Sequence, residues 1–183
     1  MKFKNALWVF FISMVPLIEL RGAIPVGTVL ELPFYINFAV GVIGNLLPIP
    51  FILLLIPKIL DIMESFSFLR PIVRWVRDKA RRTRAKILPE AESGGAVEIL
   101  DEYGNRISSP VSDKMNAGVF LGLLTFVLIP LPGTGAWTGA LVASLFEFPK
   151  FKSFLAISLG VLGCAVIMCL ASYGILGFLS FLA

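Results

Sequence analysis

Two long apolar runs without any charged side chain dominate the pattern along the chain. The first covers residues 34–57 and the second covers residues 153–183. Each run is longer than the roughly 20 residues that an α-helix needs to cross about 30 Å of hydrocarbon. The rest of the chain has too few polar residues to wrap two buried helices of this length. We therefore expect two membrane-spanning helices.

Two shorter apolar arms, residues 6–18 and 117–129, behave differently. Each has 13 residues, a length that is more often re-entrant or interfacial than spanning. Each leads into a Gly- and Pro-rich break, at residues 19–27 (ELRGAIPVG) and 130–139 (PLPGTGAWTG). We expect a re-entrant loop at each break, with a complete crossing by residues 6–18 as the alternative.

The two apolar blocks also resemble each other in sequence. Ile18, Leu20 and Gly22 match Ile129, Leu131 and Gly133 at a shift of 111 residues. Glu31, Pro33, Phe38 and Gly44 match Glu147, Pro149, Phe154 and Gly160 at a shift of 116. In transporters, short Gly- and Pro-interrupted segments at corresponding places in two halves indicate the substrate site.

The predicted fold is therefore an all-α polytopic membrane protein with an inverted repeat. Each half is a re-entrant helical hairpin followed by one long transmembrane helix. Residues 1–57 form the first membrane repeat and residues 115–183 form the second. Residues 58–114 form a polar insert between them, a cytoplasmic basic helix followed by an acidic loop.

Composition narrows the range of functions. Hydrophobic residues make up 57% of the 183 residues and charged residues 15%, against about 25% charged in a typical soluble domain. The chain has no His and two Cys, and no set of residues suggests a nucleophile with its base or a metal cluster. We expect neither an enzyme nor a bound metal or cofactor.

Positive charge is concentrated in the insert, which holds 11 of the 16 Lys and Arg residues. This bias places the insert on the cytoplasmic side of a multi-pass protein of the cell membrane. Five arginines recur there at spacings of 4, 3, 4 and 3, namely Arg70, Arg74, Arg77, Arg81 and Arg84. The spacing predicts a basic helix lying on the anionic inner leaflet. Nucleic-acid binding is disfavoured, because a membrane span tethers this helix.

Glu19 and Arg21 are the most informative charged residues, because both fall inside the first predicted loop. Ionisable groups at membrane depth are costly and therefore point to function. Removal of water favours the neutral carboxyl, so Glu19 is a candidate proton carrier. Arg21 could bind a phosphate or carboxylate through two hydrogen bonds. The alternative is a Glu–Arg pair that only neutralises itself and fixes the loop.

The second break offers backbone N–H groups rather than charges. A turn followed by a helix from about Ala136 could bind an anion at the helix N-terminus, or could simply be a tight turn that needs glycine. Asn45, in the first long run, could reach a central cavity or make an interhelical hydrogen bond. The predicted substrate-binding residues are Arg21, Gly22, Asn45, Pro132, Gly133, Thr134, Gly135 and Thr138.

The motifs ELRGAIP (residues 19–25) and PLPGTGAWTG (residues 130–139) together resemble the putative small multi-drug export protein family. That family is similar to the DedA (VTT-domain) superfamily, of which it looks like a compact relative. The resemblance implies an inverted repeat whose two re-entrant loops meet near the bilayer centre. It also implies transport coupled to the proton motive force.

The functional expectation is a small, proton-coupled membrane transporter for an amphipathic or anionic substrate that resembles a lipid or a drug. With two full spans in each chain, we expect at least a homodimer. The alternative is a non-transporting protein that organises the membrane and is held to anionic lipid by its basic helix.

Overall fold

The structure, a computed structural model, describes residues 2–87, 99–100, 106–107 and 115–182. Most of the described residues are helical. The helices are α1 (Lys2–Met14), α2 (Glu19–Val29), α3 (Phe34–Leu46), α4 (Pro48–Ser65), α5 (Arg70–Ile87), α7 (Ala117–Leu128), α8 (Ala136–Leu145) and α9 (Lys150–Leu182). Two short strands, β1 (Ile99–Leu100) and β2 (Arg106–Ile107), pair antiparallel.

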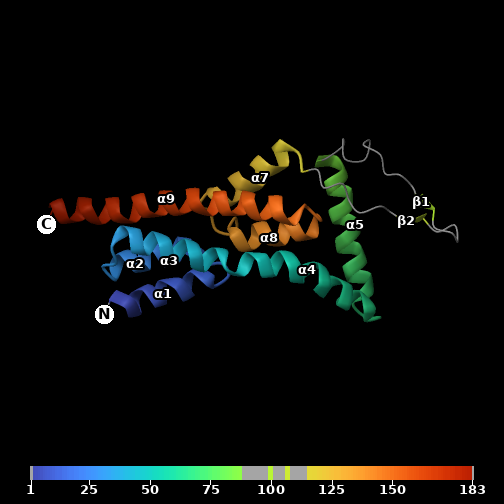
Figure 1. The fold of residues 1–183 in the computed structure, drawn as a ribbon, viewed down its shortest axis with the longest axis horizontal. Coiled ribbons are helices and arrows are strands. Elements are labelled where there is room, and N and C mark those ends of the chain that lie inside the picture. The colour runs from blue at the N-terminus through green and yellow to red at the C-terminus, as the bar shows by residue number, and fades with distance from the viewer. Residues whose placement is uncertain (1, 88–98, 101–105, 108–114, 183) are drawn as a thin grey trace.

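Two long helical rods form the body of the molecule (Figure 1). The first consists of α3 and α4, which join through Leu47 with helical backbone angles of −57° and −44°. The second is α9, which runs alongside in the opposite direction. Residues Phe34–Ser65 and Lys150–Gly174 are long and apolar enough to cross a membrane. These two stretches correspond to the two spans that the sequence predicts.

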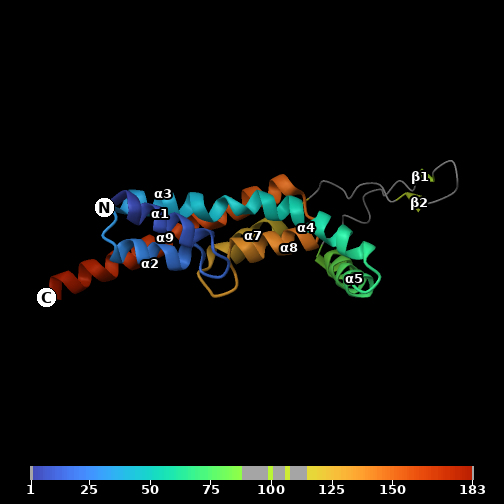
Figure 2. The ribbon, with the colours of Figure 1, turned by 90° about the horizontal axis from the view of Figure 1, so that it is seen from below.

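Two helical hairpins pack on these rods from opposite ends. The α1–α2 hairpin runs from the end with the N-terminus to the middle of the bundle and back, and α7–α8 does the same from the other end (Figure 1). Their connecting loops lie side by side near mid-length (Figure 2). Helix α2 contacts α9, and α8 contacts α4, so each hairpin touches the long rod of the other half.

The first Gly- and Pro-rich break differs from the sequence prediction, because residues 19–29 form helix α2 rather than a loop. Pro25 lies inside this helix, where it removes one backbone hydrogen bond. Tertiary burial of one face compensates: Leu20, Ala23 and Ile24 are at most 1% exposed. The second break does contain a non-helical loop, residues 129–135, and α8 begins at Ala136 as predicted.

Helices α2 and α8 end in the same way. Glu31 and Glu147 both adopt left-handed backbone conformations, with φ of 55° and 54°. After Glu31, the Leu32 N–H donates to the Gly27 carbonyl at 3.0 Å; after Glu147, the N–H of the next residue makes the equivalent bond at 2.9 Å. These are two Schellman caps. They lie 116 residues apart, the offset found in the sequence.

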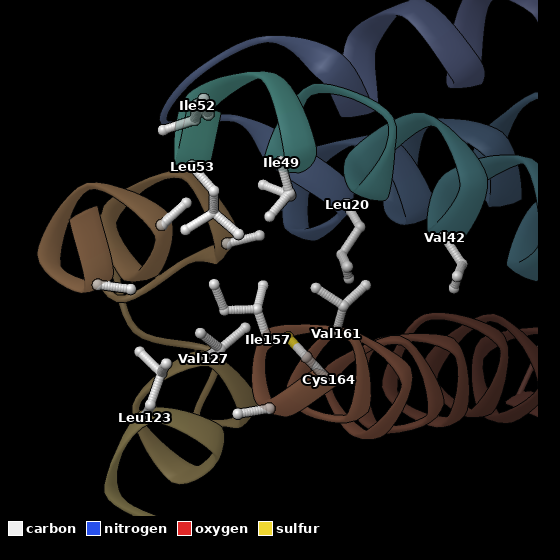
Figure 3. Close-up of a cluster of buried hydrophobic side chains, with 14 of the residues drawn as sticks. Leu20, Val42, Ile49, Ile52, Leu53, Leu123, Val127, Ile157, Val161 and Cys164 are labelled. Atoms are coloured by element: carbon white, nitrogen blue, oxygen red, sulfur yellow. The ribbon is translucent and has the colours of Figure 1, made fainter. Parts of the chain in front are cut away.

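The main hydrophobic core surrounds α9. Ile157 and Val161 project from α9 toward Leu20 of α2, Ile49 of α4 and Val127 of α7 (Figure 3). All five side chains are at most 1% exposed. The core therefore joins elements of both halves.

Large apolar side chains also cover much of the outer surface. Phe3, Trp8, Tyr35 and Leu170 are between 64% and 77% exposed. Soluble monomers rarely expose extensive apolar area, which instead marks contact with a membrane or a partner. Together with the two spans, this surface identifies a membrane protein.

Candidate functional site

Glu19 lies at the tip of the first hairpin and is only 4% exposed. Its carboxylate accepts hydrogen bonds from the backbone N–H groups of Ala136 and Trp137, each at 3.1 Å. These donors are the first residues of α8, where N–H groups have no partner within the helix. A negative charge there also interacts favourably with the helix dipole. Glu19 therefore caps a helix 117 residues away in sequence.

Gly135 makes this cap possible. A Cβ atom at position 135 would lie 1.7 Å from a carboxylate oxygen of Glu19. Only glycine leaves room for the carboxylate to reach the start of α8. The Glu19 backbone is itself left-handed, with φ of 52°, a conformation that is costly outside glycine and is often found at functional sites.

Arg21 makes the complementary contact with α7. Its guanidinium donates to the carbonyls of Val127 at 3.3 Å and Ile129 at 3.0 Å, and to the carbonyl of Leu131. It also donates to the Thr134 hydroxyl at 3.0 Å. Carbonyls at a helix C-terminus lack intrahelical partners and carry partial negative charge. Arg21 therefore satisfies the end of α7 as Glu19 satisfies the start of α8.

The contacts of Glu19 and Arg21 are with the ends of α8 and α7 rather than with each other. Among the described residues, Glu19 and Arg21 form no ion pair with each other. The group bound at the predicted anion site, the start of α8, is the Glu19 carboxylate of the same chain. The physical reason is that two broken helix ends face the first hairpin, and each attracts the charge of opposite sign.

The remaining predicted residues of the second loop divide into two groups. Thr134 joins the Arg21 cluster, and its hydroxyl also donates to the Ile129 carbonyl at 2.9 Å. Gly133 has a positive φ of 84°, as expected for a tight turn. Pro132 and Gly133 are exposed, and Thr138 is half-buried in the first turn of α8. Outside this loop, Gly22 lies in α2 against the Ile18 side chain.

Asn45 is brought to the charged residues by the fold. It lies in α3, is fully buried and lines a narrow gap together with Glu19 and Arg21. The gap is too narrow to admit a water molecule. Its other lining residues are Leu20, Val127, Ala136, Val161 and Cys164.

The contribution of α9 to this gap was missed by the sequence analysis. Val161 and Cys164 of α9 line it, and Figure 3 shows both side chains on that helix. One signal was available, because Val161 stands 116 residues after Asn45, at the equivalent position of the repeat. The two equivalent residues line the same gap.

An apolar groove of about 490 Å³ lies beside the second hairpin, between α7 and α8. Pockets of about 300–1,000 Å³ are typical for small organic ligands. Added Cβ atoms at Gly118 and Gly122 would meet nothing within 4 Å, so these two positions are open. The lining residues are Asn116, Gly118, Val119, Gly122, Leu123, Phe126, Val142, Phe146 and Phe148.

The predicted basic helix is α5, which lies across the end of the bundle (Figure 1). Arg74 pairs with Glu64 of α4 at 3.1 Å, and Arg77 pairs with Glu64 at 3.0 Å and with Asp61. Arg70 donates to the Glu64 carbonyl at 3.1 Å. The side chains of Arg81 and Arg84 are outside the described residues. Two of the five predicted arginines, Arg74 and Arg77, therefore bind acidic residues of α4.

Apolar side chains accompany these charges. Ile72 and Trp75 of α5 are 53% and 62% exposed, and Phe68 just before it is 85% exposed. The ammonium group of Lys79 lies 5.0 Å from the centre of the Trp75 ring. Exposed aromatic rings next to basic residues are typical of helices at a membrane surface.

Three comparisons with known proteins were informative to different degrees. Neither the curated proteins nor the solved structures give a match. The family model described as Putative small multi-drug export protein matches residues 19–167. This range begins at Glu19 and includes Arg21, Asn45 and the loop that receives the two charges. The chain therefore belongs to the putative small multi-drug export protein family.

Proposed function

We propose that this protein is a proton-coupled membrane transporter for an amphipathic or anionic small molecule. The observation that carries the proposal is the cross-connection at the hairpin tips. Glu19 and Arg21 of one hairpin hold both broken helix ends of the other. Transporters commonly place broken helix ends at the site of substrate and coupling ion. The family description, a small multi-drug export protein, agrees with a transport role for this chain.

The membrane arrangement that we propose is an inverted repeat with two re-entrant hairpins. Three observations support it: the hairpins approach from opposite ends, their tips meet at mid-length, and α2 and α8 carry matching Schellman caps. In this arrangement the insert with its Lys and Arg residues faces the cytoplasm. The start of α1 and the end of α9 then lie at the opposite surface.

Proton binding at Glu19 is the proposed coupling step. The ionised carboxylate holds the start of α8 through two charge-assisted hydrogen bonds, which are roughly twice as strong as neutral ones. Protonation removes the charge and weakens this cap. The freed N–H groups of Ala136 and Trp137 can then receive an anionic group of the substrate. Proton binding and anion binding thereby favour each other reciprocally.

The apolar part of the substrate fits the groove between α7 and α8. This groove includes Phe126. The carbonyl of the next residue, Val127, accepts a hydrogen bond from Arg21. The groove therefore approaches the charged tip contacts along α7. A molecule with an apolar body and an anionic end would match both parts.

The test is flux in proteoliposomes with an anionic amphipathic dye, with and without an imposed pH gradient. The wild-type protein should accumulate the dye in response to the gradient, and Glu19→Gln should lose that response. Glu31→Gln is the matched control, because Glu31 is an exposed acid at the other end of α2. Full gradient-driven accumulation by Glu19→Gln would reject the proton step. Absence of flux in the wild type would favour the membrane-organising alternative.

A further inference from the structure

Asn45 is a buried polar residue whose hydrogen-bonding groups are both unused. It is 0% exposed, and neither its side-chain nitrogen nor its side-chain oxygen has a partner. Asn37, in the same helix and equally buried, donates to the Ile24 carbonyl at 2.8 Å and contacts the Tyr173 hydroxyl at 3.1 Å. Asn45 thus lacks the interhelical hydrogen bond considered for it, whereas the side-chain nitrogen of Asn37 makes such a bond to Tyr173. An unpaired buried amide is unfavourable and requires an explanation.

The surroundings of Asn45 identify its available partner. Its neighbours across the gap are apolar except for Glu19, Arg21 and Cys164. Arg21 is engaged with α7. Glu19 is the one carboxyl group that lines this gap, and it reaches across it toward α8. The groups that face Glu19 are thus Arg21 of its own helix, the start of α8, Asn45 of α3 and Cys164 of α9.

Hydrogen-bonding capacity decides which form of Glu19 suits Asn45. An ionised carboxylate only accepts hydrogen bonds, so it could satisfy the Asn45 NH₂ group but would leave the amide oxygen unpaired. A protonated carboxyl group has one O–H donor and acceptor oxygens. It can donate to the amide oxygen while accepting from the amide nitrogen. A protonated Glu19 therefore satisfies both groups of Asn45, and an ionised one does not.

We propose that Asn45 is the docking partner of protonated Glu19. The inference rests on the proton step of the proposed function and names the residue that stabilises the protonated state. The start of α8 offers two backbone N–H donors, which suit the ionised carboxylate. Asn45 offers a donor and an acceptor, which suit the protonated carboxyl group. The carboxyl group thus has two alternative sites, α8 when ionised and Asn45 when protonated, and the unpaired amide belongs to the ionised state.

The test is infrared titration of the full-length protein in lipid nanodiscs. The carbonyl band of protonated Glu19 is the band that Glu19→Gln lacks. In Asn45→Leu the band should appear about one pH unit lower, a roughly tenfold loss of proton affinity, as expected for loss of about one hydrogen bond. The band should also shift to higher frequency, because the hydrogen bonds to its carbonyl oxygen are lost. Asn45→Ala provides a second variant if leucine prevents folding.

Asn37→Leu is the matched control, because it removes a buried asparagine from the same helix outside the gap. It should change thermal stability and leave the Glu19 titration and band frequency unchanged. An unchanged titration in both Asn45 variants, or an equal shift in Asn37→Leu, would overturn the proposal. A shift specific to Asn45 without gradient-driven flux would retain this inference and reject the transport function. Gradient-driven flux without the shift would do the reverse.

Discussion

The two hairpins are related in sequence and in their helix caps, yet they are packed differently. Helix α1 packs closely on α2, where Val9, Ala23 and Leu32 form a fully buried cluster. Helices α7 and α8 meet near their tip, where a Cβ atom on Gly139 would lie 2.8 Å from Val127, and then diverge around the apolar groove. The closely packed α1–α2 hairpin carries Glu19 and Arg21. The α7–α8 hairpin, which diverges around the groove, carries the helix ends that bind these two charges.

Small sequence differences account for the open form. At a shift of 111 residues, Gly118 and Gly122 stand where the first hairpin has Leu7 and Phe11. The connection is also longer, residues 129–135 against residues 15–18. Loosely packed elements are those that open most readily. The comparison therefore predicts that α7–α8 moves, while the backbone of α2, which carries Glu19 and Arg21, stays in place.

The largest effect is expected at the glycines where each hairpin meets its own long helix. A Cβ on Gly44 would lie 2.5 Å from the Phe10 carbonyl, and one on Gly160 would lie 2.8 Å from the Leu124 carbonyl. Gly44→Ala and Gly160→Ala should each lower the free energy of unfolding by about 1–3 kcal/mol, as overpacking typically does. Thermal unfolding in detergent measures this. Gly122→Ala, with open space around it, should be neutral or slightly stabilising. An equal loss of unfolding free energy in Gly122→Ala would contradict the difference between crowded and open glycines.

An intermediate effect is expected from filling the groove. Gly122→Leu should block transport of a bulky anionic dye while leaving the melting temperature unchanged, because the new side chain occupies space that is empty in the fold. Initial flux in proteoliposomes should fall about tenfold, which corresponds to about 1.4 kcal/mol of lost binding. Gly174→Leu, at another open glycine in α9, should leave the flux unchanged. Normal flux in Gly122→Leu would separate the groove from substrate binding.

The smallest effect is expected at α5, which packs on the long helix of the first half. Glu64→Gln removes the carboxylate that pairs with Arg74 and Arg77. These side chains are partly exposed, so the loss should be below about 1 kcal/mol and should shrink at high salt. Melting temperatures at two salt concentrations test this. A large loss of stability that does not depend on salt would contradict this expectation and would mean that the α4–α5 contact stabilises the first half.

Much of the architecture follows from the sequence alone. The charge-free runs predict both spans, and the sequence singles out Glu19 and Arg21 as the charged residues of the first break. Their partners could not be predicted, because they are backbone groups more than 100 residues away that are free only where α7 and α8 are interrupted. The helix through Gly22 and Pro25 could not be predicted either, because tertiary burial overrides the low helix propensity of glycine and proline.

The central claim is that ionised Glu19 holds the two hairpin tips together and that protonation releases them. Spin labels at Leu17 and Leu131, which are 84% and 56% exposed, report the separation of the tips in a Cys164→Ala, Cys169→Ala background. Pulsed electron–electron double resonance should give one short distance between the two spin labels at high pH and a longer distance at low pH. Glu19→Gln should give the longer distance at every pH. A distance distribution that does not change with pH in the wild type, or a short distance in Glu19→Gln, would contradict the account.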